Sequence, residues 1–146
     1  HTMLLGAHGD EMVPVLRYTN VAGIPIQDLM SEERIDSLIE RTRKGGAEIV
    51  GLLKTGSAFH APGAAIAEMV GAVSQDMRII RTCSARLDGE YGFEDLCIGV
   101  PVKLGRKGIH RIFELHLTDA ERTALEEAAE HSLRDIQTLK DLGIAD

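Results

Sequence analysis

Three strand-like segments in the second half of the chain constrain its fold more than any other feature. In LCIGVPVKL (96–104), apolar residues alternate with Cys, Gly, Pro and Lys, the period of two that is typical of a β-strand with one buried face. The preceding segment, MRIIRTCSARL (77–87), ends at the turn dipeptide Asp88-Gly89, and IHRIFEL (109–115) follows a second turn, GRKG. This order of strands and turns predicts an antiparallel meander.

Pro101 restricts where the middle strand, residues 96–104, can lie in that sheet. Proline has no backbone N–H, so it removes one hydrogen bond from the ladder of a sheet. The sequence therefore predicts that 96–104 is an edge strand or that the Pro101 ring faces outward.

Three longer patterns with helical spacing accompany the strands. Between residues 31 and 53, apolar residues recur along one helical stripe, with Ser31 in the N-cap position. The consecutive glycines 45 and 46 cost about 1 kcal/mol each relative to Ala, and we expect a bend or a close packing contact there. A second helix is expected after KTGSAFHAPG (54–63), because Pro62 suits a first helical turn.

The last helix is delimited by motifs at both of its ends. Thr118 and Glu121 form the T-x-x-E pattern of a capping box. Apolar residues then keep a helical spacing as far as Gly143, which suits a C-terminal stop. The sequence thus predicts a third long helix that begins after Thr118.

The first part of the chain contains only short extended segments, at 2–5, 12–18 and 21–26. With the meander and the three long helices they predict an α+β fold, a single domain over residues 1–146. No G-x-G-x-x-G motif follows a strand, so we expect no dinucleotide-binding (Rossmann) unit within these residues.

Composition narrows the function classes. The chain has 16 Lys and Arg against 23 Asp and Glu, a formal charge of -7, which argues against nucleic acid as a partner because phosphate binding needs clustered cations. The chain contains no apolar run of about 18 residues, the length that would predict a membrane span. Because no basic-then-apolar leader is visible either, we expect a cytoplasmic location.

The sequence does not predict a metal centre. No second histidine stands at ligand spacing from Asp10 and Glu11, and Cys83 and Cys97 lack CxxC spacing, which favours two buried thiols. No G-x-S-x-G motif indicates a serine hydrolase. Surface or structural roles are expected for the later histidines, which are His60, His110, His116 and His131.

The stretch LLGAHGDEMVPV (4–15) holds the strongest catalytic candidate, His8. It lies in a glycine-flanked loop after a short strand, where an imidazole can reach a ligand and transfer a proton at neutral pH. Taken locally, the residues leave open whether His8 is catalytic or a polar residue in a turn.

A wider pattern favours the catalytic role. LGAHGDEMVPVLRYTNVAGIPI strongly resembles the catalytic-histidine segment of the lactate/malate dehydrogenase family. G-x-HGD-x-MVP followed by VAGIP resembles the branch of bacterial lactate-dehydrogenase-like malate dehydrogenases, and RTRKGGAEIVGLLKTGSAFHAPGAAIAEMV (41–70) continues the likeness. The resemblance covers essentially all 146 residues and identifies the C-terminal, substrate-side domain of a two-domain enzyme.

The resemblance implies a chemistry and a site. His8 would accept the proton when malate is oxidised by NAD and return it when oxaloacetate is reduced. Gly56, Ser57 and Ala58 would line the substrate and nicotinamide side of the pocket, and Asp10 would support its own turn. The family's orienting aspartate, its substrate arginines and its main NAD-binding loop belong to a segment N-terminal to His1, so we expect the 146-residue chain alone to be inactive.

Two alternatives stay open. Lactate or another 2-hydroxy acid is a second substrate class, because the side chain that mainly selects the substrate belongs to that N-terminal segment. An alternative of another class is a non-catalytic oligomerisation or interaction domain, with the helices at 31–53 and 118–142 as its interface. Family resemblance implies a homo-oligomer, dimer or tetramer, in either case.

Overall fold

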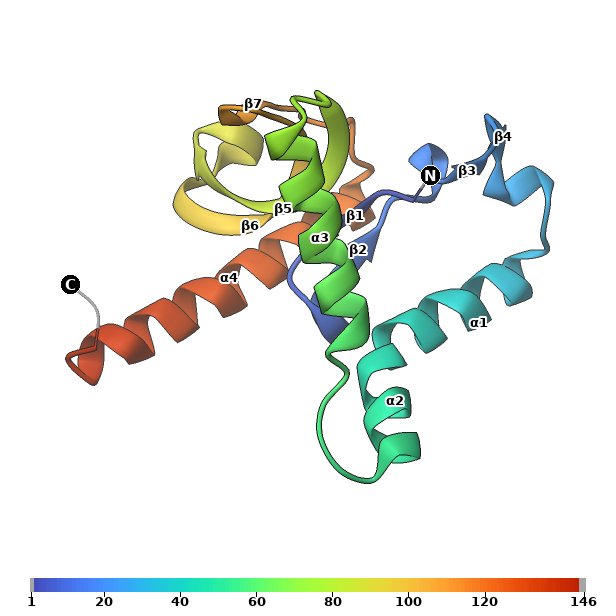
Figure 1. Ribbon diagram of the computed structural model, residues 1–146, viewed down its shortest axis with the longest axis horizontal. Helices are drawn as coiled ribbons and strands as arrows, with labels where there is room; N and C mark the ends of the chain where they lie inside the picture. The colour runs from blue at the N-terminus through green and yellow to red at the C-terminus, as the bar shows by residue number, and fades with distance from the viewer. Residues whose placement is uncertain (1, 145–146) are drawn as a thin grey trace.

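The computed structural model describes residues 2–144, so the outermost positions of the predicted domain, 1, 145 and 146, lie outside the described part (Figure 1). The helices are α1 (Glu32–Arg43), α2 (Gly45–Leu53), α3 (His60–Ser74) and α4 (Asp119–Asp141). The strands are β1 (Leu4–Gly6), β2 (Met12–Pro14), β3 (Asn20–Val21), β4 (Ile24–Pro25), β5 (Ile79–Asp88), β6 (Glu94–Gly105) and β7 (Gly108–Ile112). Short 3-10 turns are η1 (Gly9–Glu11), η2 (Leu16–Tyr18), η3 (Ile26–Asp28) and η4 (Glu90–Gly92). These elements confirm the predicted α+β class.

One five-stranded sheet organises the molecule. Its order is β2-β1-β6-β5, and β7 pairs with β6 on the same side as β1. All of its recorded pairings are antiparallel, and β5 follows β6 from Ile79 opposite Leu104 to Asp88 opposite Glu94. The predicted meander of β5, β6 and β7 is therefore confirmed, with β1 and β2 added beside it.

Both expectations for Pro101 are wrong. β6 has partners on both sides, and Pro101 is fully buried. Its carbonyl accepts a 2.9 Å hydrogen bond from the Phe113 N–H, so the missing N–H of Pro101 would have paired with the Phe113 carbonyl. That carbonyl instead accepts a 2.9 Å bond from the Tyr91 hydroxyl, and a side chain thus replaces the backbone donor that proline lacks.

The Asp88-Gly89 dipeptide does not close a two-residue hairpin. Gly89 instead leads into η4, where Tyr91 adopts a left-handed backbone conformation (φ 56°, ψ 9°). The Glu114 carboxylate accepts the Tyr91 N–H at 2.7 Å, and the Leu115 N–H donates to the Tyr91 hydroxyl at 2.9 Å. Because the connection is longer than two residues, the Tyr91 side chain reaches Phe113 and Leu115, which follow β7.

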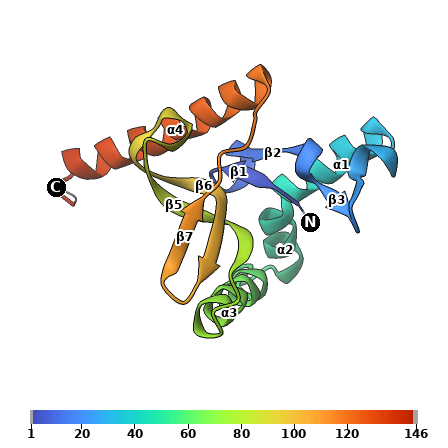
Figure 2. The same cartoon turned by 90° about the horizontal axis from the view of Figure 1, so that it is seen from above.

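The core lies between the sheet and α4. Its strand residues follow the predicted alternation, and α4 contributes Leu125, Ala128 and Ala129, all nearly inaccessible. The capping box is confirmed, because the Thr118 hydroxyl accepts the Glu121 N–H and the Glu121 carboxylate accepts the Thr118 N–H. Figure 2 shows α4 on one side of the sheet and α3 on the other.

The structure divides the predicted helix at 31–53 into α1 and α2, so residues 2–144 contain four helices in place of the expected three. The break falls at Lys44 (φ -90°, ψ 1°), next to the two glycines, neither of which has a close neighbour. Within residues 2–144 the glycines therefore mark a bend and make no close packing contact. Ser31 takes the N-cap position without a side-chain capping bond. Paired contacts between Arg41 and Glu48 brace the bend.

Two N-terminal expectations also change. The extended segment predicted at 12–18 is β2 followed by the turn η2, and the one at 21–26 is the ribbon of β3 and β4. Ala22 and Gly23 both have positive φ, as the two central residues of a type I′ hairpin turn require. None of the helices in residues 2–144 is both long and apolar enough to cross a membrane.

Candidate active site

His8 lies at the junction between β1 and the 3-10 turn η1. Its backbone is extended (φ -86°, ψ 142°), and the Met12 N–H closes the turn on the Gly9 carbonyl. The side chain is exposed at the end of the strand. This segment, residues 6–12, is here termed the His8 turn. The exposed place of the imidazole after a short strand agrees with the sequence pattern, and its catalytic role stays a prediction.

Two glycines make the His8 turn possible. Gly6 has φ +85°, and a Cβ there would lie 2.7 Å from the Glu11 carbonyl oxygen. Opposite it on β6, a Cβ at Gly99 would lie 2.6 Å from the Gly6 carbonyl oxygen. Both distances are too short for any side chain. The fold of the turn therefore requires glycine at position 6, and the approach of β1 to β6 requires glycine at position 99.

An open hollow of about 490 Å³ adjoins His8. It is formed by β1, β5, β6 and the turn of α4 at Ser132, and its polar side chains are Thr82, Ser84, Cys97 and Ser132. Within residues 2–144 no group of three or more His, Cys, Asp or Glu side chains has the arrangement of a metal site. The hollow offers hydroxyl and thiol groups beside one imidazole.

The predicted pocket residues Gly56, Ser57 and Ala58 lie in the connection between α2 and α3. Gly56 has φ +88°, and the Ser57 carbonyl accepts the Phe59 N–H at 2.9 Å. None of the three lines the hollow beside His8. Their role in a substrate pocket stays a prediction.

Asp10 does not support its own turn by a hydrogen bond in the described residues, contrary to expectation. It is exposed, and its charge acts on Lys44 at the bend between α1 and α2. The contact with Glu40 is the main reason that the pKa of Lys44 is raised, and Asp10 adds to it. Asp10 thus contributes a surface charge within the His8 turn.

Two side chains that sequence reasoning assigned no site role anchor the His8 turn. Nδ1 of His131, on α4, lies 2.7 Å from Oε1 of Glu11. Arg43, at the end of α1, donates from Nη2 to the Met12 carbonyl at 3.2 Å. No local motif predicts these contacts, because each joins residues that are far apart in the sequence.

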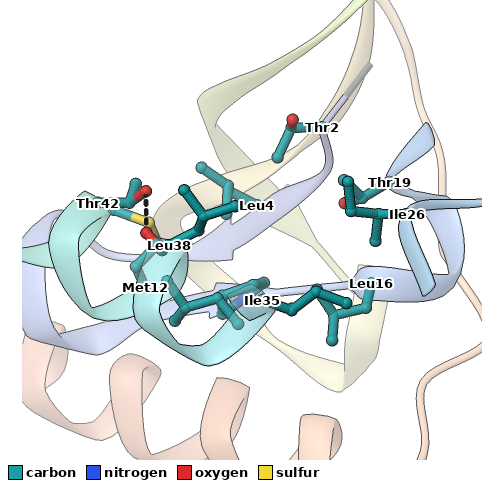
Figure 3. A pocket seen from close by; sticks show the side chains of 11 residues that line it. Thr2, Leu4, Met12, Leu16, Thr19, Ile26, Ile35, Leu38 and Thr42 are labelled. Atoms are coloured by element: carbon teal, nitrogen blue, oxygen red, sulfur yellow. Dashed lines mark hydrogen bonds between the residues drawn. The ribbon is translucent and has the colours of Figure 1, made fainter. Parts of the chain in front are cut away.

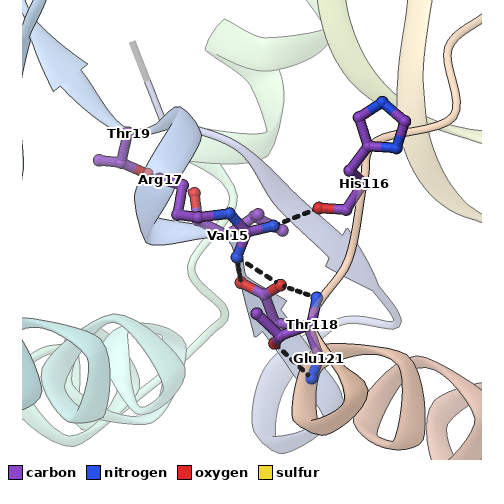
Figure 4. Close-up of polar contacts among 6 residues, drawn as sticks. All are labelled: Val15, Arg17, Thr19, His116, Thr118 and Glu121. Carbon is purple, nitrogen blue, oxygen red and sulfur yellow. Dashed lines mark hydrogen bonds and ion pairs between the residues drawn. The ribbon is translucent and has the colours of Figure 1, made fainter.

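A second network fixes the start of α4 against η2 (Figure 4). Arg17 Nη1 reaches both carboxylate oxygens of Glu121, at 2.8 and 2.7 Å, and its Nη2 donates to the His116 carbonyl. Burial raises the pKa of Glu121, but the bonds from Thr118 and Arg17 outweigh it and hold this pKa below its usual range. The network therefore depends on an ionised Glu121.

Figure 3 shows a different hollow, of about 260 Å³, between α1 and the N-terminal strands and turns. Apart from three threonines its lining is apolar, with Leu4, Met12, Leu16, Ile26, Ile35, Leu38 and Ile39 among the side chains. It contains no titratable group, so it cannot carry the acid–base chemistry considered for His8.

Comparison with known proteins identifies the family to which this fold belongs. Residues 1–142 match the family model of the lactate/malate dehydrogenase alpha/beta C-terminal domain. Malate dehydrogenase from Roseiflexus castenholzii is 50% identical over 140 residues, which cover 96% of this chain and 45% of that protein. The malate dehydrogenase structure from Salinibacter ruber has a TM-score of 0.91 at 48% identity and covers 98% of this chain and 48% of its own.

A lactate dehydrogenase has a similar fold as well. The structure from Eimeria maxima, with NADH and oxamate, has a TM-score of 0.93 at 34% identity, over 98% of this chain and 46% of that one. The sheet, α4 and the His8 turn thus form a C-terminal dehydrogenase domain. The chain belongs to the lactate/malate dehydrogenase family. It spans about half the length of the relatives it matches.

Proposed function

We propose that this chain is the substrate-side half of an NAD-dependent malate dehydrogenase, with His8 as its proton acceptor and donor. The observation that carries the proposal is the exposed imidazole at the end of β1, beside an open hollow, in a domain about 50% identical to malate dehydrogenases. In malate oxidation His8 would take the proton of the C2 hydroxyl. In oxaloacetate reduction it would return that proton to the carbonyl oxygen.

The dinucleotide does not fit these residues as a complete site. The strand pairings recorded for residues 2–144 are antiparallel, and no strand there leads through a glycine-rich turn into a helix that could hold the pyrophosphate. We therefore assign NAD, which would accept the hydride, to a part of the enzyme outside residues 2–144. The contribution of this chain is the positioned imidazole and one wall of the substrate site, with Gly56, Ser57 and Ala58 as further candidates.

The exposed helices support a larger active protein. On α2 and α3, apolar side chains including Leu52, Ile66 and Val70 are 60% exposed or more, which is costly unless another surface covers them. We propose that the N-terminal half of the enzyme covers this face and that the complete enzyme is a homo-oligomer. The non-catalytic alternative would keep such a surface without needing His8.

Malate is favoured over lactate because the bacterial relatives at about 50% identity are named malate dehydrogenases. The Eimeria lactate dehydrogenase, at 34% identity, keeps the second substrate class as the alternative. Turnover of malate and of lactate by the full-length enzyme distinguishes the two.

A chimaera tests the proposal. Residues 2–144 replace the matching half of the Salinibacter ruber malate dehydrogenase, and NADH oxidation with oxaloacetate is measured. We expect activity, and a loss of about 10²–10⁴-fold in kcat in His8→Ala, the usual contribution of a general acid–base group. His116→Ala, at another exposed histidine, should leave kcat unchanged.

Two results would contradict the proposal: a folded chimaera that does not reduce oxaloacetate, or a His8→Ala variant that keeps full activity. The 146-residue chain by itself should show no turnover, since positioning by the missing groups supplies much of the rate. Robust activity of the chain alone, lost in His8→Ala, would show instead that the catalytic site is complete within it.

A further inference from the structure

We infer that His131 is a positioning residue, which holds the His8 turn against α4 so that the His8 imidazole keeps its orientation. The inference rests on the proposed catalytic role of His8. It assigns a purpose to a contact that joins the last helix of the chain to the turn near its beginning.

The contact between His131 and Glu11 is made at the end of the short turn that follows His8. Glu11 is the last residue of η1, three positions after His8, and its Oε1 lies 2.7 Å from Nδ1 of His131. The two side chains keep 33% and 48% of their accessible surface, so the pair is partly shielded from water. A shift of Glu11 away from α4 would rotate the short turn, and His8 with it.

The helix that carries His131, α4, is held in place by packing and by hydrogen bonds at its start. Ala128, one turn earlier on the same face, is buried, and its Cβ lies 3.4 Å from the position that a Cβ on Gly6 would take. The Thr118 capping box and the Arg17–Glu121 contacts hold the start of the helix. The His8 turn is therefore pressed against α4 at Gly6 and tied to it at Glu11.

The other anchor acts on a different group. Arg43 binds the Met12 carbonyl, and its Nε is buried without a hydrogen-bond partner among the described residues. Titratable side chains around the same cleft, of about 410 Å³, are Asp10, Glu11, Arg43, Glu127, Glu130, His131 and Arg134. Arg134 reaches Glu130 at 3.8 Å, so of the recorded contacts only that of His131 reaches the Glu11 carboxylate.

The chimaera that contains residues 2–144 tests the inference by separating kcat from KM. In His131→Ala we expect kcat for oxaloacetate reduction to fall about tenfold, because a displaced catalytic group costs rate, with KM within about twofold. His131→Asn, whose amide nitrogen replaces Nδ1, should recover most of kcat. Arg134→Ala, on the same face of α4 and in the same cleft, is the matched control and should change neither constant.

A second variant protects the test against misfolding. If His131→Ala does not fold, as judged by its thermal transition, Glu11→Ala removes the other partner of the contact and should give the same loss of kcat. Amide hydrogen exchange of the same chimaera supplies a readout independent of catalysis. Exchange at Gly9–Met12 should be faster in His131→Ala and unchanged in Arg134→Ala.

The outcomes keep the two proposals apart. A chimaera without His8-dependent turnover would contradict the proposed function. A chimaera that depends on His8, but in which His131→Ala behaves like Arg134→Ala, would overturn this inference alone. A rise in KM without loss of kcat, or an Asn variant no better than Ala, would also overturn it.

Discussion

The sheet with α4 and the pair of helices α2 and α3 use apolar residues in opposite ways. On β6 and α4, Leu96 and Leu125 are only 1% and 2% exposed. On α2, Leu52 is 76% exposed, and in α3 only Ala72 is buried. In Figures 1 and 2 both helices lie outside the sheet–α4 unit. The sheet–α4 unit buries its hydrophobic residues within itself, whereas α2 and α3 leave many of theirs exposed.

Matched leucine truncations give the largest test of this contrast. Leu96→Ala should lower the free energy of unfolding by about 3 kcal/mol, the usual cost of a cavity in a packed core. Leu52→Ala should change it by less than about 0.5 kcal/mol, as at an exposed site. Urea unfolding of the 146-residue chain, followed by circular dichroism, measures both. Equal losses would mean that α2 is packed in solution and that the contrast is wrong.

Tyr91→Phe tests how far the sheet–α4 unit depends on one hydroxyl. We expect a loss of about 1–2 kcal/mol, because the Phe113 carbonyl and the Leu115 N–H both lose their partner. Burial raises the pKa of Tyr91, so the unfolded state releases its proton first and stability falls above about pH 10. Thermal unfolding of the variant should lose this alkaline dependence. Tyr18→Phe, the other tyrosine, is the control, and an equal loss there would contradict the assignment.

Glu121→Gln should have the smallest effect, about 1 kcal/mol near pH 7, because the exposure of Arg17 weakens their ion pair. The pKa of Glu121 is lowered in the folded state, so its contribution is present above the unfolded pKa near 4.3 and is lost as pH falls. The difference from wild type should therefore vanish in acid unfolding experiments. A difference that persists below pH 3, or an equal effect of the exposed Glu126→Gln, would break the prediction.

Local signals predicted much of the sheet–α4 unit. The alternation of residues 96–104 and the Thr118–Glu121 motif describe contacts within one strand and one helical turn, and the structure confirms both. The expectation for Pro101 failed because the Tyr91 hydroxyl, in the turn before β6, donates to the Phe113 carbonyl in place of the N–H that Pro101 lacks. The α1–α2 division depended on whether the glycines at 45 and 46 have neighbours, which spacing alone does not reveal.

The candidate site divides in the same way. The motif around His8 predicted its place at a strand end, since that place depends on a few adjacent residues. The contacts of His131 and Arg43 with the His8 turn depend on how α4 and α1 pack, and no periodicity encodes such long-range pairings. Gly56, Ser57 and Ala58 lie in the connection between α2 and α3 and do not line the hollow beside His8, so their role in a substrate pocket stays a prediction.

The buried Pro101 has a consequence for how the sheet assembles. Only one alignment of β7 on β6 puts the missing N–H opposite the Phe113 carbonyl, which has the Tyr91 hydroxyl as its donor. A slipped alignment would leave a different carbonyl without any donor, at a cost of about 1–3 kcal/mol. The Tyr91 hydroxyl and Pro101 thus together favour the observed alignment of β7 on β6 over a slipped one.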